Sequence, residues 1–387
     1  MTLKKRAEFI ALTKPRITEE EISAVVNVMR SGWWTTGPET MAFEQEMVEY
    51  LGGGLYAVGL DSCTSGLFLA LKALDIGPGD EVIVPTMTYV ATAHVVEWCG
   101  AKPILCDVDQ YTRNIDIEDC ARKITANTKV IIPVHIAGLP VDLDELAKLA
   151  DKHEIKIIED AAHAVGSSYK GLRIGHHSLA SVFSFYVTKN LACGEGGMLV
   201  SSDSDFVDKI RKLSYFGIDK QAFQRHTKKG SWFYQVEGPG FKCNMDNIHA
   251  AIGRVQLNKL DTFTEKRRQI AVWYDELLPD EIQKPVRDHQ STHCFHLYQI
   301  GLPVSWKRDA FVSHLKEWNI GCSVHFIPLH EHPHYFTEDS QFEGCSRISH
   351  RNLSLPMDPG LNIDDIKYIS DVINRYKENL LSTNYYR

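Results

Sequence analysis

The stretch IKIIEDAAHAVG, residues 155–166, decides the fold together with VFSFYVTKNLACGEGG, residues 182–197. Each begins with a short apolar run and then changes abruptly to acidic, small or glycine-rich residues, the pattern of a buried strand that runs into a loop. In an open parallel sheet, the carboxyl ends of the strands face the crevice where ligands bind. We therefore expect Asp160 and Lys189 to lie at the same crevice.

Further short apolar runs on both sides of these segments predict the rest of a sheet. From about Tyr56 to Ser202 they alternate with amphipathic segments, which is typical of βα units around a mostly parallel sheet. One such segment, residues 141–153, places four apolar side chains on one face of a helix, as packing on a sheet requires. The expected strands are EVIVP (81–85), KPILCDV (102–108), KVIIPVHI (129–136), IKIIED (155–160), VFSF (182–185) and GMLVSS (197–202).

A long helix is predicted from Asp246 to Leu278, with Pro279 as its stop, and we place a domain boundary inside it. The expected large α/β domain, with the N-terminal segment, occupies residues 1–262. A smaller α+β domain occupies residues 263–387. Its expected elements are a strand FHLYQIGL (295–302), a helix KRDAFVSHLKEW (307–318), a strand IGCSVHF (320–326) and a helix DDIKYISDVINRYKENLL (364–381).

Composition limits the classes of function. The 387 residues are 44% hydrophobic and carry a net charge of -8, so the chain can bury a large core but lacks the basic surface that nucleic acid or an anionic membrane needs. The N-terminus lacks the apolar run of a signal peptide, and no run reaches transmembrane length. The nine cysteines are scattered without CxxC pairs, which indicates reduced thiols and a cytoplasmic protein.

Lys189 lies between an apolar strand and the glycine-rich GEGG. A single lysine is most often a solvated surface charge. Here the buried flank indicates an amine whose pKa is lowered by burial, as an amine that forms an imine needs. The same amine can also move a proton between two carbon atoms.

Asp160, at the end of its strand, has two interpretations. It caps the segment that follows, or it holds the pyridine nitrogen of pyridoxal 5′-phosphate (PLP) in its protonated form, so that the ring withdraws electrons.

A possible anion site and an aromatic residue precede these two segments. In DSCTSG, the first turn of a helix offers backbone amides and a favourable dipole, so Thr64 and Ser65 are candidates to bind a phosphate. The alternative is that Ser62 or Thr64 is only an N-cap. Tyr89 in PTMTYVATA is either a ring that stacks on a flat cofactor or a packing residue.

The order of these signals resembles the DegT/StrS family of PLP-dependent nucleotide-sugar aminotransferases. The similarity covers nearly the whole chain, from SGWWTTGP through GDEVIVPT, EDAAHA, FSFxxxKNxxxGEGG and FKCNMDNIHAAIGRVQL to SVHFIPLH. It implies an α/β fold of fold-type I, like that of aspartate aminotransferase. It also implies PLP as the cofactor.

The resemblance assigns roles residue by residue. Lys189 matches the catalytic lysine that holds PLP as a Schiff base, and Asp160 matches the partner of the pyridine nitrogen. Asn244 matches a residue that reaches the phosphate from the partner subunit, which implies a homodimer with shared sites. The other cofactor-binding matches are Thr64, Ser65 and Ser184 at the phosphate, Tyr89 on the ring and His163 near the ring hydroxyl.

Within the family, the chain is most similar to the enzymes that form UDP-4-amino-4-deoxy-L-arabinose. This implies transfer of an amino group from L-glutamate to C4 of a UDP-linked 4-keto-sugar by a ping-pong mechanism. The alternatives are amination at C3 of a dTDP-linked 3-keto-sugar, or a PLP-binding regulator without turnover. Cys63, Tyr186 and Val187 depart from those enzymes, so the sugar pocket is expected to differ.

Candidate substrate contacts lie in two segments. The loop 217–240, with Arg225, is expected to close over the nucleotide or to be a solvated loop. The histidine-rich HFIPLHEHPHYF offers His325 and His330 as sugar or diphosphate contacts. We expect no metal site there, because no Cys or Asp joins these histidines in a known ligand spacing. Tyr186, beside the lysine, completes the candidate substrate residues.

Overall fold

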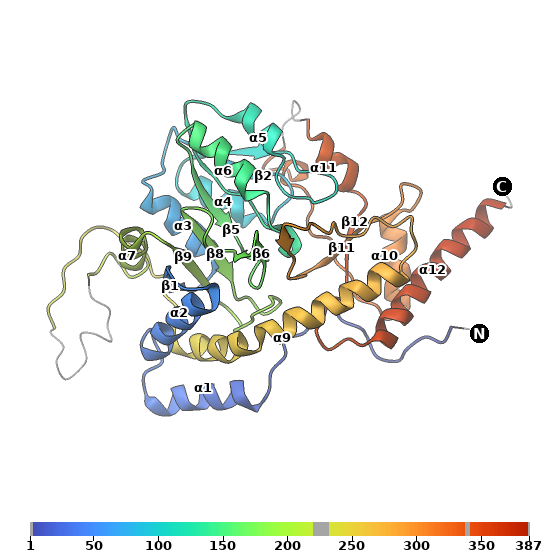
Figure 1. Cartoon of the computed structure of the whole chain (residues 1–387), viewed down its shortest axis with the longest axis horizontal. Coiled ribbons are helices and arrows are strands. Elements are labelled where there is room, and N and C mark those ends of the chain that lie inside the picture. Colours follow the sequence, from blue (N-terminus) through green and yellow to red (C-terminus); the bar gives the residue numbers. More distant parts are fainter. Residues whose placement is uncertain (1–2, 220–231, 337–340, 386–387) are drawn as a thin grey trace.

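The computed structural model describes residues 3–219, 232–336 and 341–385, and its centre is a seven-stranded sheet (Figure 1). The strand order is β1-β9-β8-β5-β4-β2-β3, and β9 alone runs antiparallel to its neighbours. The strands are β1 (Tyr56–Leu60), β2 (Glu81–Pro85), β3 (Lys102–Cys106), β4 (Thr128–Ile131), β5 (Lys156–Asp160), β8 (Ala180–Ser184) and β9 (Gly197–Ser201). The six strands expected from the sequence are therefore confirmed, and β1 is added.

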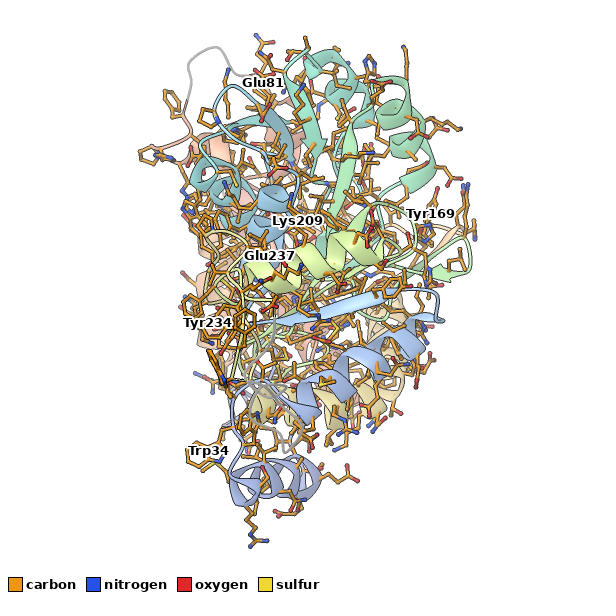
Figure 2. The ribbon with its side chains drawn as sticks, turned by 90° about the vertical axis from the view of Figure 1, so that its left-hand side faces the viewer. Trp34, Glu81, Tyr169, Lys209, Tyr234 and Glu237 are labelled. Carbon is orange, nitrogen blue, oxygen red and sulfur yellow. The ribbon has the colours of Figure 1, made fainter. Side chains whose placement is uncertain are left out.

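Helices cover both faces of this sheet, because its strands direct apolar side chains alternately to the two faces. Ile158 and Val182 pack in the core beneath α3, whereas Ile157 and Phe183 face the opposite side. At the β1 edge, α7 lies over β1 with Lys209 on the helix (Figure 2). The flanking helices are α2 (Pro38–Leu51), α3 (Cys63–Ala73), α4 (Ala91–Trp98), α5 (Ile117–Lys123), α6 (Leu143–Lys152) and α7 (Ser204–Leu213).

The long helix α9 (Asn247–Leu277) runs from the large sheet to a second core, as Figure 1 shows. Helix α1 (Glu19–Ser31) packs along it. The second core includes Ile10 from the N-terminal segment, and the domain division at residue 262 stays a prediction. The elements around this core are the antiparallel strands β11 (Tyr298–Gly301) and β12 (Asn352–Leu355), with α10 (Arg308–Glu317) and α12 (Ile363–Tyr385).

One expected strand is wrong. Residues 320–326 form only isolated bridges in the described structure, Ile320 with Ile10 and Ser323 with Ser354. Instead, β12 pairs with β11. The reason is that the chain leaves the sheet at His325, whose carbonyl oxygen accepts hydrogen bonds from the side chains of Gln299 and Asn352 rather than from a neighbouring strand.

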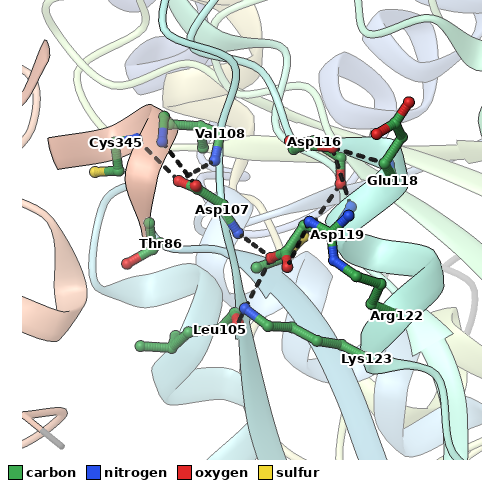
Figure 3. A network of polar contacts seen from close by, with 12 residues as sticks. Thr86, Leu105, Asp107, Val108, Asp116, Glu118, Asp119, Arg122, Lys123 and Cys345 are labelled. Atoms are coloured by element: carbon green, nitrogen blue, oxygen red, sulfur yellow. Dashed lines mark hydrogen bonds and ion pairs between the residues drawn. The ribbon is translucent and has the colours of Figure 1, made fainter. Parts of the chain in front are cut away.

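Asp107, just after β3, connects the large sheet to the later part of the chain (Figure 3). Its carboxylate accepts hydrogen bonds from the backbone N–H groups of Gly344 (2.8 Å) and Cys345 (2.9 Å), at the start of α11 (Glu343–Ile348). Asp119 in turn accepts from the N–H of Asp107 at 2.7 Å. A carboxylate at a helix start is favourable, so this contact attaches the segment after His325 to the sheet.

Among the described residues, none of the helices combines the length and the apolar character that a membrane span requires.

Replacement of Gly197 by alanine tests the close packing of β9 against the start of α3. A Cβ at this position would lie 2.4 Å from the carbonyl carbon of Ser62 and 2.5 Å from the N atom of Cys63. Because backbone cannot move aside cheaply, Gly197→Ala is expected to lower the free energy of unfolding by about 1–3 kcal/mol. Denaturation midpoints measure this. Gly77→Ala, whose Cβ would meet no atom closer than 3.9 Å, is the control, and equal stability of the two variants would contradict the prediction.

Candidate active site

A cavity of about 480 Å³ opens at the carboxyl ends of β2, β5 and β8, beside the start of α3. This is the crevice that the strand ends predicted. Most of the residues singled out in the sequence line it together. They are Thr64, Tyr89, Asp160, His163, Ser184, Tyr186, Lys189 and His325.

Lys189 reaches the cavity from the loop after β8. Its backbone N–H donates to the carbonyl oxygen of Tyr186 at 2.8 Å, which fixes the turn. Burial lowers the pKa of its amine to about 8, although the carboxylate of Asp160 acts to raise it. Within the described residues, the Lys189 amine has neither a hydrogen bond nor an ion pair. It is thus available as a nucleophile near neutral pH.

Asp160 ends β5, and its carboxylate is buried in the cavity wall. It accepts a hydrogen bond from the hydroxyl of Thr92 at 2.9 Å and from the backbone N–H of Ala162 at 3.1 Å. The thiol of Cys63 lies 3.8 Å away. Burial raises the pKa of Asp160, against those hydrogen bonds and the charge of Lys189. Asp160 therefore caps the next segment and also presents a carboxylate to the cavity.

The neighbouring Glu159 faces the opposite side of the sheet. It accepts hydrogen bonds from His135 at 2.6 Å and from the hydroxyl of Ser178 at 2.5 Å. Burial acts to raise its pKa, but these two partners lower it below the usual value. This buried, fully paired carboxylate fixes the end of β5 and so the position of Asp160.

The start of α3 forms the opposite end of the cavity. Ser62 is the N-cap, because its hydroxyl accepts from the backbone N–H of Ser65 at 3.1 Å, which is the capping interpretation of this segment. Thr64 and Ser184 line the cavity, whereas Ser65 does not and its hydroxyl lies 2.9 Å from that of Ser62. The first-turn amides with Thr64 make a suitable place for an anion.

Aromatic and imidazole rings form one wall. Phe326 lies between Tyr89 and His163, with ring centroids 6.0 Å from each. Tyr89 contacts Phe326 but keeps 60% of its surface exposed, and it lines the cavity. Burial lowers the pKa of His325 to about 4 and that of His163 well below its usual value, so both rings are neutral at neutral pH.

Besides Ser65, two expected residues, His330 and Asn244, do not line this cavity. His330 bonds to Thr86 at 2.6 Å and stacks on Phe342, which attaches its segment to the sheet. Asn244 contacts the hydroxyl of Thr36 and the amine of Lys242. Arg225 lies outside the described residues. Their functional roles stay predictions.

Sequence reasoning missed several residues that the structure brings to the site. Thr92 follows Tyr89 by three positions on the turn into α4, so helical spacing was a usable signal. No local signal marks His296 and Phe326, which come from separate segments of the C-terminal part. No group of acidic, histidine or cysteine residues able to hold a metal occurs in the part of the chain that the structure describes.

Known proteins are similar to this chain in sequence and in structure. Residues 15–374 match the DegT/DnrJ/EryC1/StrS aminotransferase family. The spore coat polysaccharide biosynthesis protein SpsC of Bacillus subtilis is 41% identical over 382 residues, which cover 96% of this chain and 98% of that protein.

Solved structures agree with this. The putative sugar aminotransferase Spr1654 from Streptococcus pneumoniae, in its PMP form, has a TM-score of 0.90 at 31% identity and covers 97% of this chain and 100% of its own. Its PLP form has a TM-score of 0.89. PseC from Helicobacter pylori, an aminotransferase involved in the biosynthesis of pseudoaminic acid, has a TM-score of 0.89 at 26% identity and covers 96% and 100%.

The mostly parallel sheet, with a lysine and a carboxylate in the crevice at its strand ends, defines the class of PLP-dependent transferases of fold-type I. The chain belongs to the DegT/DnrJ/EryC1/StrS aminotransferase family and is a PLP-dependent sugar aminotransferase.

The pKa of Lys189 generates a prediction for the cofactor-free protein. Labelling of this amine by an amine-reactive reagent, followed by mass spectrometry, is expected to rise with pH around a midpoint near 8, because only the unprotonated amine reacts. Asp160→Asn is expected to lower the midpoint, since the carboxylate charge raises the pKa of Lys189. Asp109→Asn is the control, because Asp109 does not line the cavity. A midpoint that Asp160→Asn leaves in place would contradict the expected coupling.

Proposed function

We propose that this protein transfers an amino group from L-glutamate to C4 of a UDP-linked 4-keto-sugar in two half-reactions. The observation that carries the proposal is the unpaired amine of Lys189, with its lowered pKa, in the same cavity as the buried carboxylate of Asp160. Surface polysaccharide biosynthesis is the corresponding process, supported by the 41% identity to SpsC.

The residues of the cavity fit PLP. A buried carboxylate, an unpaired amine and the start of a helix are the three contacts that its pyridine nitrogen, aldehyde and phosphate need. Bound PLP supplies an electron-withdrawing ring that stabilises negative charge on the substrate carbon. Asp160 would hold the pyridine nitrogen, Tyr89 would stack on the ring, and His163 would lie at its hydroxyl. Thr64 and Ser184, which line the cavity, would hold the phosphate, and Ser65 would reach it only by turning its hydroxyl away from Ser62.

Lys189 would carry two steps. Its unprotonated amine, which the lowered pKa makes available near neutral pH, would be the group that holds the cofactor. When a substrate amine takes its place, the Lys189 amine would act as the base that accepts a proton from the substrate carbon and later returns it. Phe326, His163 and His325 would limit the access of water to the reacting carbon.

A second copy of the chain would complete the site. Asn244 does not line the cavity of its own chain, which suits a residue that reaches the phosphate of the partner subunit. Helix α1 supports this homodimer, because it exposes three apolar side chains at helical spacing, Ile22, Val26 and Met29. Trp34, just after the C-terminal end of α1, is exposed as well (Figure 2).

The substrate side of the cavity would be formed by Tyr186 and His325, which line it, with His330 on the same segment as His325. Arg225 would meet the nucleotide. An enzyme that aminates C3 of a dTDP-linked 3-keto-sugar would use the same lysine and carboxylate. Only a comparison of substrates therefore separates C3 amination from C4 amination.

Replacement of Lys189 tests the aminotransferase chemistry. The purified protein with PLP is expected to show the absorbance band of lysine-bound cofactor, and L-glutamate is expected to bleach it. Lys189→Ala is expected to abolish the band and to reduce turnover by about a hundredfold or more, because both the covalent link and the proton transfer are lost. Lys102→Ala, an exposed lysine, is the control. Repeated turnover by Lys189→Ala, or a band that no amino donor bleaches, would refute the assignment.

A substrate panel tests the sugar. With glutamate as donor, a UDP-linked 4-keto-sugar is expected to give the highest kcat/KM among UDP- and dTDP-linked 3-keto- and 4-keto-sugars, with the amino-sugar product identified by mass spectrometry. A preference for the dTDP-linked 3-keto-sugar would replace C4 amination by the C3 alternative.

A further inference from the structure

His296 forms part of the cavity wall, although neither its neighbours in sequence nor the strand β11 that follows it point there. Its side chain is 95% buried, since only 5% of its surface is exposed. Its ring lies against that of His163, with a centroid distance of 4.4 Å. A polar ring this deep in a substrate cavity needs a hydrogen-bonding partner for each nitrogen.

Asn190 fixes which nitrogen of His296 carries the proton. The amide group of Asn190 donates to the carbonyl oxygen of Cys294 at 3.2 Å, so its oxygen is the atom that faces His296. Nδ1 of His296 lies 3.3 Å from that oxygen and must therefore donate to it. In the neutral ring, Nε2 of His296 is then an acceptor. Burial, with the charges of neighbouring groups, keeps the pKa of His296 well below its usual value, so the neutral form is present.

His163 carries its proton on the other ring nitrogen. Its Nδ1 accepts a hydrogen bond from the backbone N–H of Ala137 at 3.3 Å, so its proton is on Nε2, which is a donor. The carbonyl oxygen of Ala137 accepts from the N–H of Leu297 at 3.3 Å. Ala137 has a φ of 57°, a left-handed conformation that costs energy for a residue with a side chain. One strained backbone unit thus holds both imidazole rings in place.

Neither Nε2 atom has a hydrogen-bond partner among the described residues. The cavity therefore presents a donor from His163 beside an acceptor from His296. The Nε2–H of His163 would be taken by the ring hydroxyl of bound PLP, which leaves the acceptor of His296 for a donor on the substrate, and a sugar hydroxyl donates such a hydrogen bond. A carboxylate or phosphate cannot, because it has no proton to give to His296.

We propose that His296 is a further substrate-binding residue of this enzyme, whose Nε2 accepts a hydrogen bond from a hydroxyl of the bound sugar. Asn190 is the positioning residue that sets the acceptor tautomer. The inference rests on the proposed reaction with a keto-sugar. It concerns the sugar half-reaction alone, because the amino group of glutamate, its one hydrogen-bond donor near neutral pH, is the group that reacts.

Half-reactions measured separately on the holoenzyme test this. His296→Phe keeps a flat ring but removes the acceptor, and is expected to raise the KM for the keto-sugar about tenfold, the effect of one hydrogen bond. Bleaching of the cofactor band by glutamate is expected to stay unchanged. His296→Gln, whose amide oxygen can accept, is expected to recover part of the loss. His293→Phe removes a buried histidine outside the cavity and is the control for packing.

Sugars that lack one hydroxyl identify the group. The wild-type enzyme is expected to lose about tenfold in kcat/KM for one monodeoxy keto-sugar, whereas His296→Phe no longer distinguishes it from the parent sugar. Equal KM values for wild type and His296→Phe, or an equal loss in the glutamate half-reaction, would overturn the inference. If the wild-type enzyme aminates none of the sugars, the proposed function has failed instead.

Discussion

The position of Asp160 is the constraint on which the rest of the site depends. Its carboxylate is buried at the end of β5, where burial alone would favour the protonated form. The hydrogen bonds from Thr92 and Ala162 offset that effect, and Glu159 on the other face fixes the strand end through His135. Lys189 experiences the same low-dielectric surroundings, which disfavour its charged form. The same burial thus raises the pKa of Asp160 and lowers the pKa of Lys189.

The later part of the chain completes the site without contributing to the large sheet. Asp107 and Thr86, both at strand ends of that sheet, hold α11 and His330. The segment between β11 and His330 is thereby held against the crevice, and it carries His325 and Phe326 into the cavity wall. His325 is consequently carried by a different core from the one beneath Asp160.

Much of the fold could be predicted from local patterns. Parallel strands buried on both faces are continuous apolar runs, so β2, β5 and β8 were recognisable without their partners. The segment 320–326 also has apolar strand-like sequence, but its backbone partners are side chains and single bridges. Periodicity cannot reveal that difference, because it depends on which groups are nearby in space.

The sequence by itself determined the parts of the site that follow directly from a strand end: Asp160, Lys189 and the start of α3. These positions are fixed by local rules, since the carboxyl ends of parallel strands meet at one edge. Only the tertiary structure decided the surroundings of these groups. The pKa of Lys189, the tautomer of His296 and the pairing of its ring with His163 arise from residues far apart in the chain, because burial and hydrogen bonding are properties of packed neighbours.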